Sequence, residues 1–402
     1  MKSSTLKNVV DPSCKVIIQG RDAVKGGSVQ ILGVIHEDPF SYQTWSGSSY
    51  YFFSSLKNSN HLYKAISAEP PQFVSYLYKL LSFHPDMAKW KFKYHINTAY
   101  YKEMTKVALN KIKDCNDDEY NIILQIGAWY DLTRIKDKRT VSYHDGNLSA
   151  LLKSPYGYPR IRRSIIETTL RYEKQLYAGM DHIFPMSQWL ANSFIHDFDV
   201  DHRKVTPVGA GINLPYIRKV NAKNYDEPNI LFVGKDWARK GGQYLLEAFT
   251  RVRQEVRHST LTIVGPTIPS DFEGVKCTGH VAKSDTGGIE TLLTEYSRAS
   301  IFVMPSLYEP FGIVFAEAMA HKLPCVGTNI CAIPEIIDNG VNGYVVPVKD
   351  SKVLATRMID LLKNPGMCKE FGENAFNKYS QNYTWDVVTQ KIIERLRSKD
   401  LQ

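Results

Sequence analysis

The stretch 301–320 constrains the fold more than any other part of the chain, because in it a buried strand leads through a short loop into a helix. Residues 301–304 are all apolar, as a strand buried on both faces requires, and Pro305 ends the run. From Phe311 onward apolar residues recur every three or four positions, which predicts a helix that begins near Gly312. Apolar runs alternate with helical patterns through the second half of the chain, so we expect an α/β fold with a parallel sheet covered on both faces.

The start of this predicted helix is a candidate anion-binding site. The amides of Gly312, Ile313 and Val314 have no partners within the helix, and the peptide dipoles add partial positive charge there. Glu317 lies further inside the helix and leans back toward its start, where its carboxylate would accept hydrogen bonds from hydroxyls such as a ribose diol. Glu309, on the preceding loop, would face the other end of the ligand and bind sugar hydroxyls.

The length of the chain predicts more than one domain. A chain of 402 residues exceeds what one hydrophobic core usually supports, so we expect two domains of about 200 residues each. Residues 57–120 read as several amphipathic helical pieces, and the opening residues, to about Asp22, as an irregular arm or an edge strand. The chain has no run of about 18 apolar residues and does not open with a secretory signal, which predicts a protein that stays in the cytosol.

Basic side chains are concentrated in the first half. Residues 1–220 contain 29 Lys and Arg against 20 Asp and Glu, a net charge of +9, whereas residues 221–402 contain 21 of each. A basic half-molecule can bind the inner face of an anionic membrane, a polyanionic acceptor or nucleic acid, and a merely solvated basic surface is the alternative. Nucleic acid is not expected as a partner, because no helix combines its basic residues with an ordered base-reading face.

The two glutamates and their neighbours resemble the motif of retaining glycosyltransferases of family 4, in the large GT-B class. The similarity covers Glu309 to Ala320 and continues in the same order through Pro324, 334–337 and 343–347. It implies a GT-B fold, in which two Rossmann-like, doubly wound parallel-sheet domains face a cleft. It also implies three parts: an acceptor-side domain at 1–215, a nucleotide-sugar-binding domain at 216–384, and a closing helix at 385–402 that packs back on the first domain.

The resemblance assigns donor-binding residues in the second domain. Lys235 and Lys240, which follow a predicted strand ending in Gly234, resemble the basic pair that the family aims at the donor diphosphate. At the first position of the pair, where the family frequently has Arg, this chain has Lys235. The positive charge is kept, but the bidentate binding of phosphate that Arg provides is lost. Val281 lies where the backbone of the family usually meets the base, and Phe311 adjoins the anion-binding amides.

Two residues of the first domain are assigned in the same way. The family usually places paired glycines on the loop after the first strand, facing the donor phosphates. Here Ser46 and Gly47 occupy that position, so Gly47 alone allows close approach. His144 ends a predicted strand and resembles the histidine that the family places beside the transferred sugar. Because ligands gather outside the carboxyl ends of strands in open α/β sheets, we expect His144 on the rim of the cleft.

The chain contains one sequence that suggests a metal site. Asp197, Asp199 and Asp201 match the Asp-x-Asp spacing with which the other large glycosyltransferase fold holds a divalent ion. We do not expect a metal here, because the run is far in sequence from the anion-binding helix and the protein supplies its own positive groups. The six cysteines have neither disulfide nor zinc spacing. We therefore predict no metal and no cofactor besides the nucleotide-sugar substrate.

The resemblance implies a hexosyltransferase. It would move a sugar from a UDP- or GDP-sugar to a hydroxyl of a glycan or a lipid-linked acceptor, with Lys235, Lys240, Glu309 and His144 as catalytic residues. Two alternatives remain open: a GT-B phosphorylase or sugar-nucleotide epimerase with a related site, and a non-catalytic sugar- or membrane-binding protein that keeps the fold.

Overall fold

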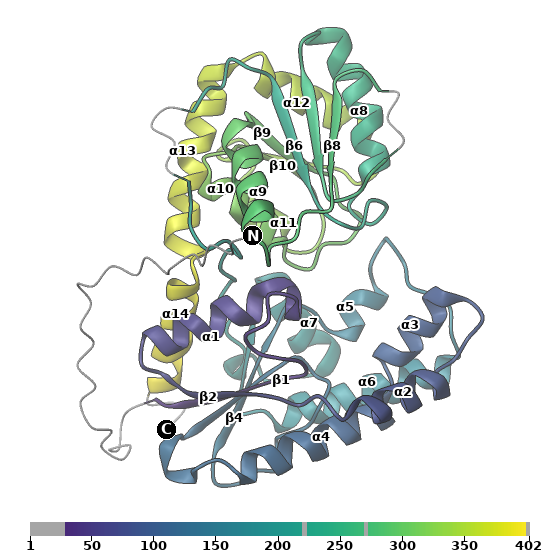
Figure 1. Cartoon of the computed structure of the whole chain (residues 1–402), viewed down its shortest axis with the longest axis vertical. Helices are drawn as coiled ribbons and strands as arrows, with labels where there is room; N and C mark the ends of the chain where they lie inside the picture. The colour runs from purple at the N-terminus through teal and green to yellow at the C-terminus, as the bar shows by residue number, and fades with distance from the viewer. Residues whose placement is uncertain (1–28, 219–222, 269–271, 399–402) are drawn as a thin grey trace, which may run out of the picture.

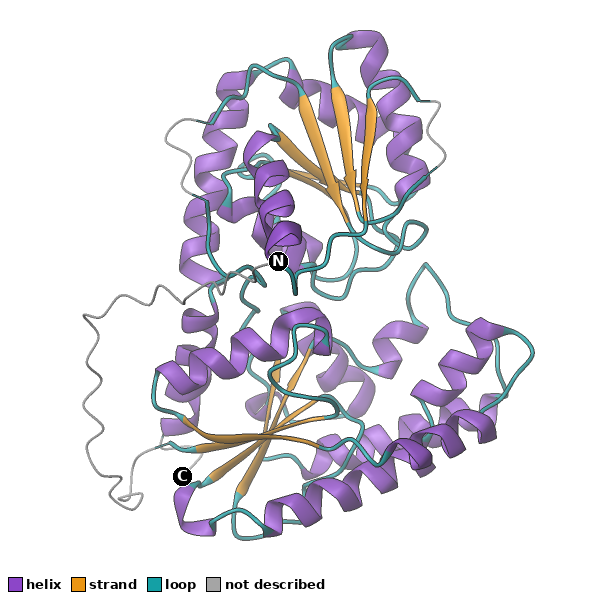
Figure 2. Cartoon of the chain, in the orientation of Figure 1, coloured by secondary structure: helices purple, strands orange, loops and turns teal. Residues whose placement is uncertain are grey.

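The computed structural model describes residues 29–218, 223–268 and 272–398, and the predicted N-terminal arm lies outside these residues. The described chain forms two α/β domains, each with its own parallel sheet between helices (Figures 1 and 2). Among the described residues, no helix has the length and apolar character needed to cross a membrane.

The first domain contains a five-stranded sheet in the order β2-β1-β3-β4-β5, with every neighbouring pair parallel. Its strands are β1 Ile31–Ile35, β2 Leu62–Ser67, β3 Ile122–Ile126, β4 Arg139–His144 and β5 His182–Pro185. The three all-buried strands β1, β3 and β5 are mostly apolar, as strands covered on both faces must be, and their buried polar residues are Gln125 and His182. The prediction of helical pieces throughout 57–120 was wrong at β2, because this edge strand is only partly buried and carries no continuous apolar run.

The described residues of this domain form seven α-helices. They are α1 Ser48–Asn58, α2 Gln72–Leu81, α3 Met87–His95, α4 Thr98–Lys113, α5 Leu148–Leu152, α6 Arg163–Gly179 and α7 Gln188–Phe198. Three short 3-10 helices lie at Thr44–Gly47, Asp117–Glu119 and His202–Lys204. Side-chain oxygens of Asp86, Asn97 and Ser187 accept hydrogen bonds from the second or third amides in the first turns of α3, α4 and α7, which fixes where these helices begin.

The second domain contains a six-stranded parallel sheet in the order β11-β10-β9-β6-β7-β8. Its strands are β6 Asn229–Val233, β7 Thr260–Val264, β8 Val275–Gly279, β9 Ile301–Met304, β10 Cys325–Thr328 and β11 Gly343–Val346. Its helices are α8 Gly242–Glu255, α9 Thr286–Arg298, α10 Ile313–Ala320, α11 Ile333–Ile336, α12 Ser351–Leu362 and α13 Pro365–Asn382. Strand β9 is central and fully buried, and helix α10 follows it as the apolar pattern predicted.

The last helix, α14 Trp385–Arg397, returns to the first domain and packs against α1 (Figure 1). The Trp385 ring lies 5.6 Å from the ring of Phe52, and Ser55 Oγ donates a 2.7 Å hydrogen bond to Asp386 Oδ1. A second contact joins the domains near α7: the carboxylate of Glu335, in α11, accepts hydrogen bonds of 2.8 and 2.6 Å from the first two amides of α7. These contacts hold the carboxyl ends of the two sheets toward each other.

Candidate active site

A cleft of about 820 Å³ lies between the domains, lined by loops that follow strands of both sheets. Of the predicted site residues, all except Gly47 and His144 line it. The residues that do so are Gly234, Lys235, Lys240, Val281, Glu309, Phe311, Gly312, Ile313, Val314 and Glu317. The tertiary structure therefore brings together groups that are more than 80 positions apart in the sequence.

The N-terminus of α10 opens onto this cleft. Gly312 is the N-cap and has a φ of 97°, and no side chain caps the helix. A Cβ at Gly312 would lie 2.9 Å from Cδ2 of Phe315 and 3.3 Å from Cγ of Glu309, so both the backbone angle and the space require glycine. Because neither a side chain nor a Cβ covers the first turn, its amides are accessible to an anion in the cleft.

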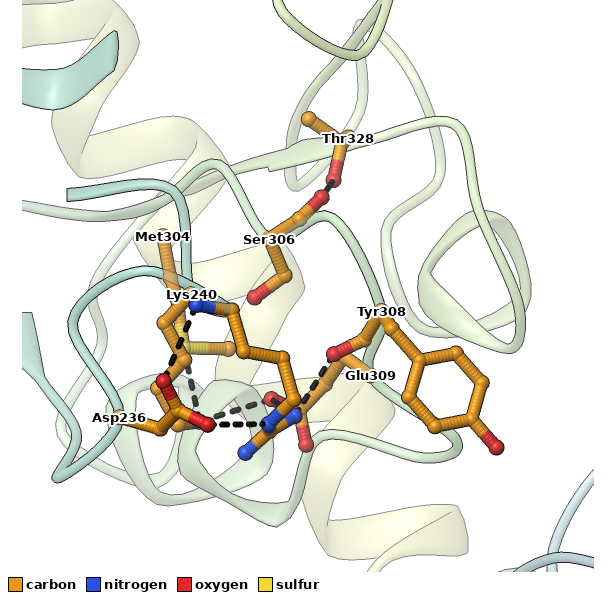
Figure 3. A network of polar contacts seen from close by, with 8 residues as sticks. Asp236, Lys240, Met304, Ser306, Tyr308, Glu309 and Thr328 are labelled. Carbon is orange, nitrogen blue, oxygen red and sulfur yellow. Dashed lines mark hydrogen bonds and ion pairs between the residues drawn. The ribbon is translucent and has the colours of Figure 1, made fainter. Parts of the chain in front are cut away.

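Lys240 and Glu309 form an ion pair in the cleft wall (Figure 3). Lys240 is buried, and its Nζ lies 2.7 Å from Glu309 Oε2 and 3.2 Å from the sulfur of Met304. A Cβ on Gly234 would lie 2.1 Å from Cδ of Lys240, so this glycine makes room for the lysine chain. Although burial alone would raise the pKa of Glu309, the charges of Lys240 and Arg239 hold it below its ordinary value. The carboxylate therefore stays ionised in the cleft.

Arg239 is a site residue that the sequence prediction omitted. Its Nη1 donates a 2.6 Å hydrogen bond to the carbonyl of Tyr308 and lies 3.3 Å from Glu309 Oε2, and its Nε lies 3.4 Å from Asp236. The backbone of Arg239 also accepts a 2.8 Å hydrogen bond from the amide of Leu307. The loop after β6 and the loop after β9 are thus tied together, which fixes the position of Glu309.

Lys235 differs from its two basic neighbours. Its side chain is exposed at the cleft, and within the described part of the chain it makes no ion pair or side-chain hydrogen bond. Since Arg239 and Lys240 already contact Glu309, Lys235 is the cation of this loop whose charge remains available to a bound anion.

Glu317 is fully buried at the back of the cleft and already has three hydrogen-bond donors. Its carboxylate accepts from Lys283 Nζ at 2.5 Å, from the hydroxyl of Tyr296 at 3.0 Å and from the backbone amide of Asn213 at 3.3 Å. We expected hydroxyls of a ligand at this carboxylate. Lys283 is the donor that reaches it from a partly exposed position, so a ligand hydroxyl would have to share Glu317 with Lys283 or displace it.

The loop before α1 has an unusual backbone. Trp45, Ser46 and Gly47 all have positive φ, at 49°, 58° and 90°, a conformation that is unfavourable for the first two. Ser46 and Ser48 line the cleft, whereas Gly47 between them does not, and the contact of Gly47 with a ligand stays a prediction. Trp45 Nε1 donates a 2.9 Å hydrogen bond to Asp145 Oδ2, which links this loop to the end of β4.

His144 does not lie on the cleft, and its predicted position was wrong. It is buried beneath the rim, with its ring 5.5 Å from that of Tyr177 and 5.1 Å from that of Phe194. Burial lowers the pKa of His144 to about 3, so its ring is neutral at physiological pH. Because successive side chains of a strand point to opposite faces, the next residue, Asp145, reaches the cleft instead. The same alternation, applied to the sequence, could have identified Asp145.

Burial raises the pKa of the Asp145 carboxyl above its ordinary value, and the hydrogen bond from Trp45 opposes this shift. Asp145 is the carboxylate that the first domain contributes to the lining of the cleft, opposite Glu309 of the second domain. The hydroxyl of Tyr308 lies near Gly146, about 4.0 Å from where a Cβ would stand, so the loop that carries Glu309 reaches the end of β4.

Among the described residues, no group of three His, Cys, Asp or Glu side chains is arranged to hold a metal ion. The aspartates of the Asp-x-Asp run bind groups of the first domain: Asp197 accepts from Ser149 and Ser193, Asp199 pairs with Lys174, and Asp201 caps the 3-10 helix that follows it. None of the three lines the interdomain cleft.

Part of the chain is similar in sequence to known glycosyltransferases. Residues 227–364 match the family described as Glycosyl transferases group 1. An uncharacterised glycosyltransferase of Methanocaldococcus jannaschii is 32% identical over 205 residues, which are 48% of this chain and 52% of the relative. The alignments with this and the next two curated relatives span between 48% and 65% of their lengths.

Solved structures resemble nearly the whole chain. Sucrose-phosphate synthase from Thermosynechococcus elongatus superimposes with a TM-score of 0.65 at 17% identity, covering 92% of this chain and 98% of that one. The Anabaena protein HepE in complex with UDP-glucose superimposes with a TM-score of 0.61 at 14% identity, covering 91% of this chain and 99% of that one. The two parallel-sheet domains therefore form the GT-B fold that the sequence predicted.

Proposed function

We propose that this protein is a retaining glycosyltransferase that moves a hexose from a nucleotide diphosphate-sugar to an acceptor hydroxyl. The observation that carries the proposal is the convergence, in one interdomain cleft, of the uncapped start of α10, the cations Lys235 and Lys240, and the ionised Glu309. The family match over residues 227–364 supports it, because that segment contains all of these groups. The UDP-glucose complex of a protein with the same fold supports a nucleotide-sugar as the donor.

The diphosphate of the donor would lie at the start of α10. There the backbone amides and Lys235 supply positive charge in fixed positions, so they stabilise the charge that develops on the diphosphate as the bond to the sugar breaks. Lys240 stabilises this charge less directly, because its ammonium group is already paired with Glu309. No metal is needed for this role, since the protein itself neutralises the leaving group.

The transferred sugar would lie between Glu309 and Asp145. Glu309 is held ionised and rigid by two cations, so it can accept hydrogen bonds from sugar hydroxyls without reorganisation. With the sugar fixed in this way, the acceptor hydroxyl attacks from the side on which the diphosphate leaves, and a phosphate oxygen of the leaving group accepts its proton. The anomeric configuration is then retained. The acceptor in this proposal is a glycan or a glycolipid.

A donor screen tests this function. The full chain is incubated with UDP- and GDP-sugars in the presence of EDTA, and thermal unfolding is followed. A ligand that binds only the folded state at 100 times its Kd stabilises it by about 2.7 kcal/mol, so one class of donor is expected to raise the Tm by several degrees. Release of nucleoside diphosphate is then measured with an acceptor panel. Failure of every nucleotide-sugar to raise the Tm would refute the proposal, and phosphorolysis without transfer would replace it with a phosphorylase.

A further inference from the structure

Helix α2 has its apolar face directed to solvent, which is the reverse of an ordinary surface helix. Its apolar residues Phe73, Tyr76, Leu77, Leu80 and Leu81 follow the i, i+3, i+4, i+7, i+8 spacing of a single helical face. All five are between 51% and 73% exposed, and no residue of α2 is buried. An amphipathic helix of a soluble domain normally directs this face to the core, so the face of α2 lacks a partner within the described chain.

The inner side of α2 is anchored, so its orientation is fixed by the fold. The hydroxyl of Ser75 lies 2.8 Å from that of Tyr100 in α4, and the ring of Tyr78 packs 5.4 Å from the same tyrosine. At the other end, Trp90 Nε1 of α3 donates a 2.7 Å hydrogen bond to the backbone carbonyl of Lys79. These contacts leave the opposite side of α2, which carries the leucines, on the outside.

The exposed apolar face extends beyond α2. Phe83 and Met87, at the turn into α3, are also more than half exposed. The loop that precedes α6 adds the exposed Tyr156 and Tyr158, and the ring of Tyr158 lies 5.9 Å from that of Phe92 in α3. Nine of the thirteen large exposed apolar side chains among the described residues belong to this surface, which we call the α2–α3 face. Such a concentration on one end of a domain marks an interaction site.

The charge around this face is positive. Residues 70–97 and 154–162 contain six Lys and Arg against one Asp, a net charge of +5 out of the +9 of the whole chain. Lys79, Lys91, Arg160 and Arg162 are exposed. An apolar face that is bordered by aromatic and basic side chains matches the interface of an anionic bilayer, where apolar groups enter the acyl boundary and cations meet the headgroups. A second copy of the chain fits less well, because a two-fold contact would place these cations against one another.

We propose that the α2–α3 face docks the protein on an anionic lipid surface. In Figure 1 the two helices form the right-hand end of the first domain, away from α14. Docking there leaves the donor-binding second domain facing solution, while the first domain, which we expect to bind the acceptor, lies at the bilayer. The inference concerns binding alone, so it stands or falls independently of the proposed transfer activity.

Vesicle flotation of the full chain tests the proposal without donor or acceptor. Vesicles of phosphatidylcholine with 30% phosphatidylglycerol are compared with pure phosphatidylcholine. We expect the protein to bind the anionic vesicles at least about tenfold more tightly than the neutral ones, and this binding should weaken with added salt. The variant Phe73→Ser/Leu77→Ser/Leu80→Ser should bind at least about tenfold more weakly. Lys79→Gln and Lys91→Gln should each lower binding about fivefold, since a basic residue near an anionic surface contributes about 1 kcal/mol.

The control variant Phe272→Ser/Val341→Ser removes exposed apolar side chains of the second domain and should bind as the wild type does. All these substitutions are at exposed positions, and an unchanged Tm verifies that each variant folds. Equal binding of the wild type and the α2 variant would overturn the proposal, as would absence of binding to anionic vesicles. Sedimentation in the absence of lipid adds a third outcome: a wild-type dimer that the α2 variant dissociates would assign the face to self-association instead.

Discussion

Replacement of Lys240 by methionine tests the central feature of the site. Methionine keeps most of the length and apolar character of the lysine chain, so the space beside Gly234 stays filled while the charge is lost. Glu309 is then a buried carboxylate that has lost its 2.7 Å partner and keeps only Arg239 at 3.3 Å. The change therefore affects both the stability of the second domain and the charge of the cleft.

The expected loss of stability in the Lys240→Met variant follows from the burial of the Lys240–Glu309 ion pair. The side chains of Lys240 and Glu309 are only 10% and 12% exposed, so solvent screens the lost interaction little. Removal of one partner of a buried ion pair costs about 3–5 kcal/mol, and the remaining contact with Arg239 places the expected loss near the lower end, at about 3 kcal/mol. For a domain of this size that corresponds to a fall in Tm of about 6–12 °C. Turnover, measured well below the Tm, should fall about a hundredfold or more.

The pH dependence gives an independent check. In the wild type the pKa of Glu309 is lowered from its ordinary value of 4.5, so its ionised form stabilises the fold above that pH, and the contribution is lost as the pH falls through the lowered value. Without Lys240 the effect of burial is less opposed, so the pKa of Glu309 should rise. The acid limb of the Tm–pH profile should therefore begin at a higher pH in the Lys240→Met variant.

The matched control is Lys363→Met, which breaks a pair of similar length, 2.8 Å to Glu255, at the surface of the same domain. Because both partners are about half exposed, this change should alter the Tm little and leave turnover unaffected. A Lys240→Met variant with wild-type turnover and an unshifted acid limb would refute the role given to the pair. A loss of stability with normal turnover would leave Lys240 a purely structural residue.

Three further changes separate the parts of the site. Asp145→Asn keeps the hydrogen bond from Trp45 but removes the charge, so we expect kcat to fall about tenfold to a hundredfold with little change in donor Kd. Complete loss of turnover, together with a covalent glycosyl-enzyme trapped in related variants, would indicate a double displacement instead. Gly312→Ala should lower donor affinity in calorimetric titration at least about tenfold, because its Cβ would strain the φ of 97° and approach Phe315 within 2.9 Å; unchanged affinity would exclude the start of α10 as the diphosphate site. Glu335→Gln weakens the bond between the domains at α7, and chemical denaturation should show a loss of about 1–2 kcal/mol with donor affinity retained.

The sequence by itself determined the elements that depend on local pattern. The all-apolar run at 301–304 and the helical spacing from Phe311 onward specify a buried strand and a helix that begins near Gly312, without reference to any other part of the chain. The same reasoning placed Lys235, Lys240 and Glu309 on loops at strand ends, where a parallel sheet collects its ligands. The length and the alternation of elements specified two α/β domains.

The tertiary structure decided what depends on the direction of side chains and on distant partners. Sequence position could not show that Glu317 meets Lys283 and Tyr296, because those contacts form only when α9 and the loop after β8 fold against α10. The choice between His144 and Asp145 likewise depends on which face of β4 meets the cleft. Finally, the spacing of apolar residues in α2 identifies its apolar face equally well whether that face is buried or exposed. Only the packing of its other side against α4 directs the leucines outward.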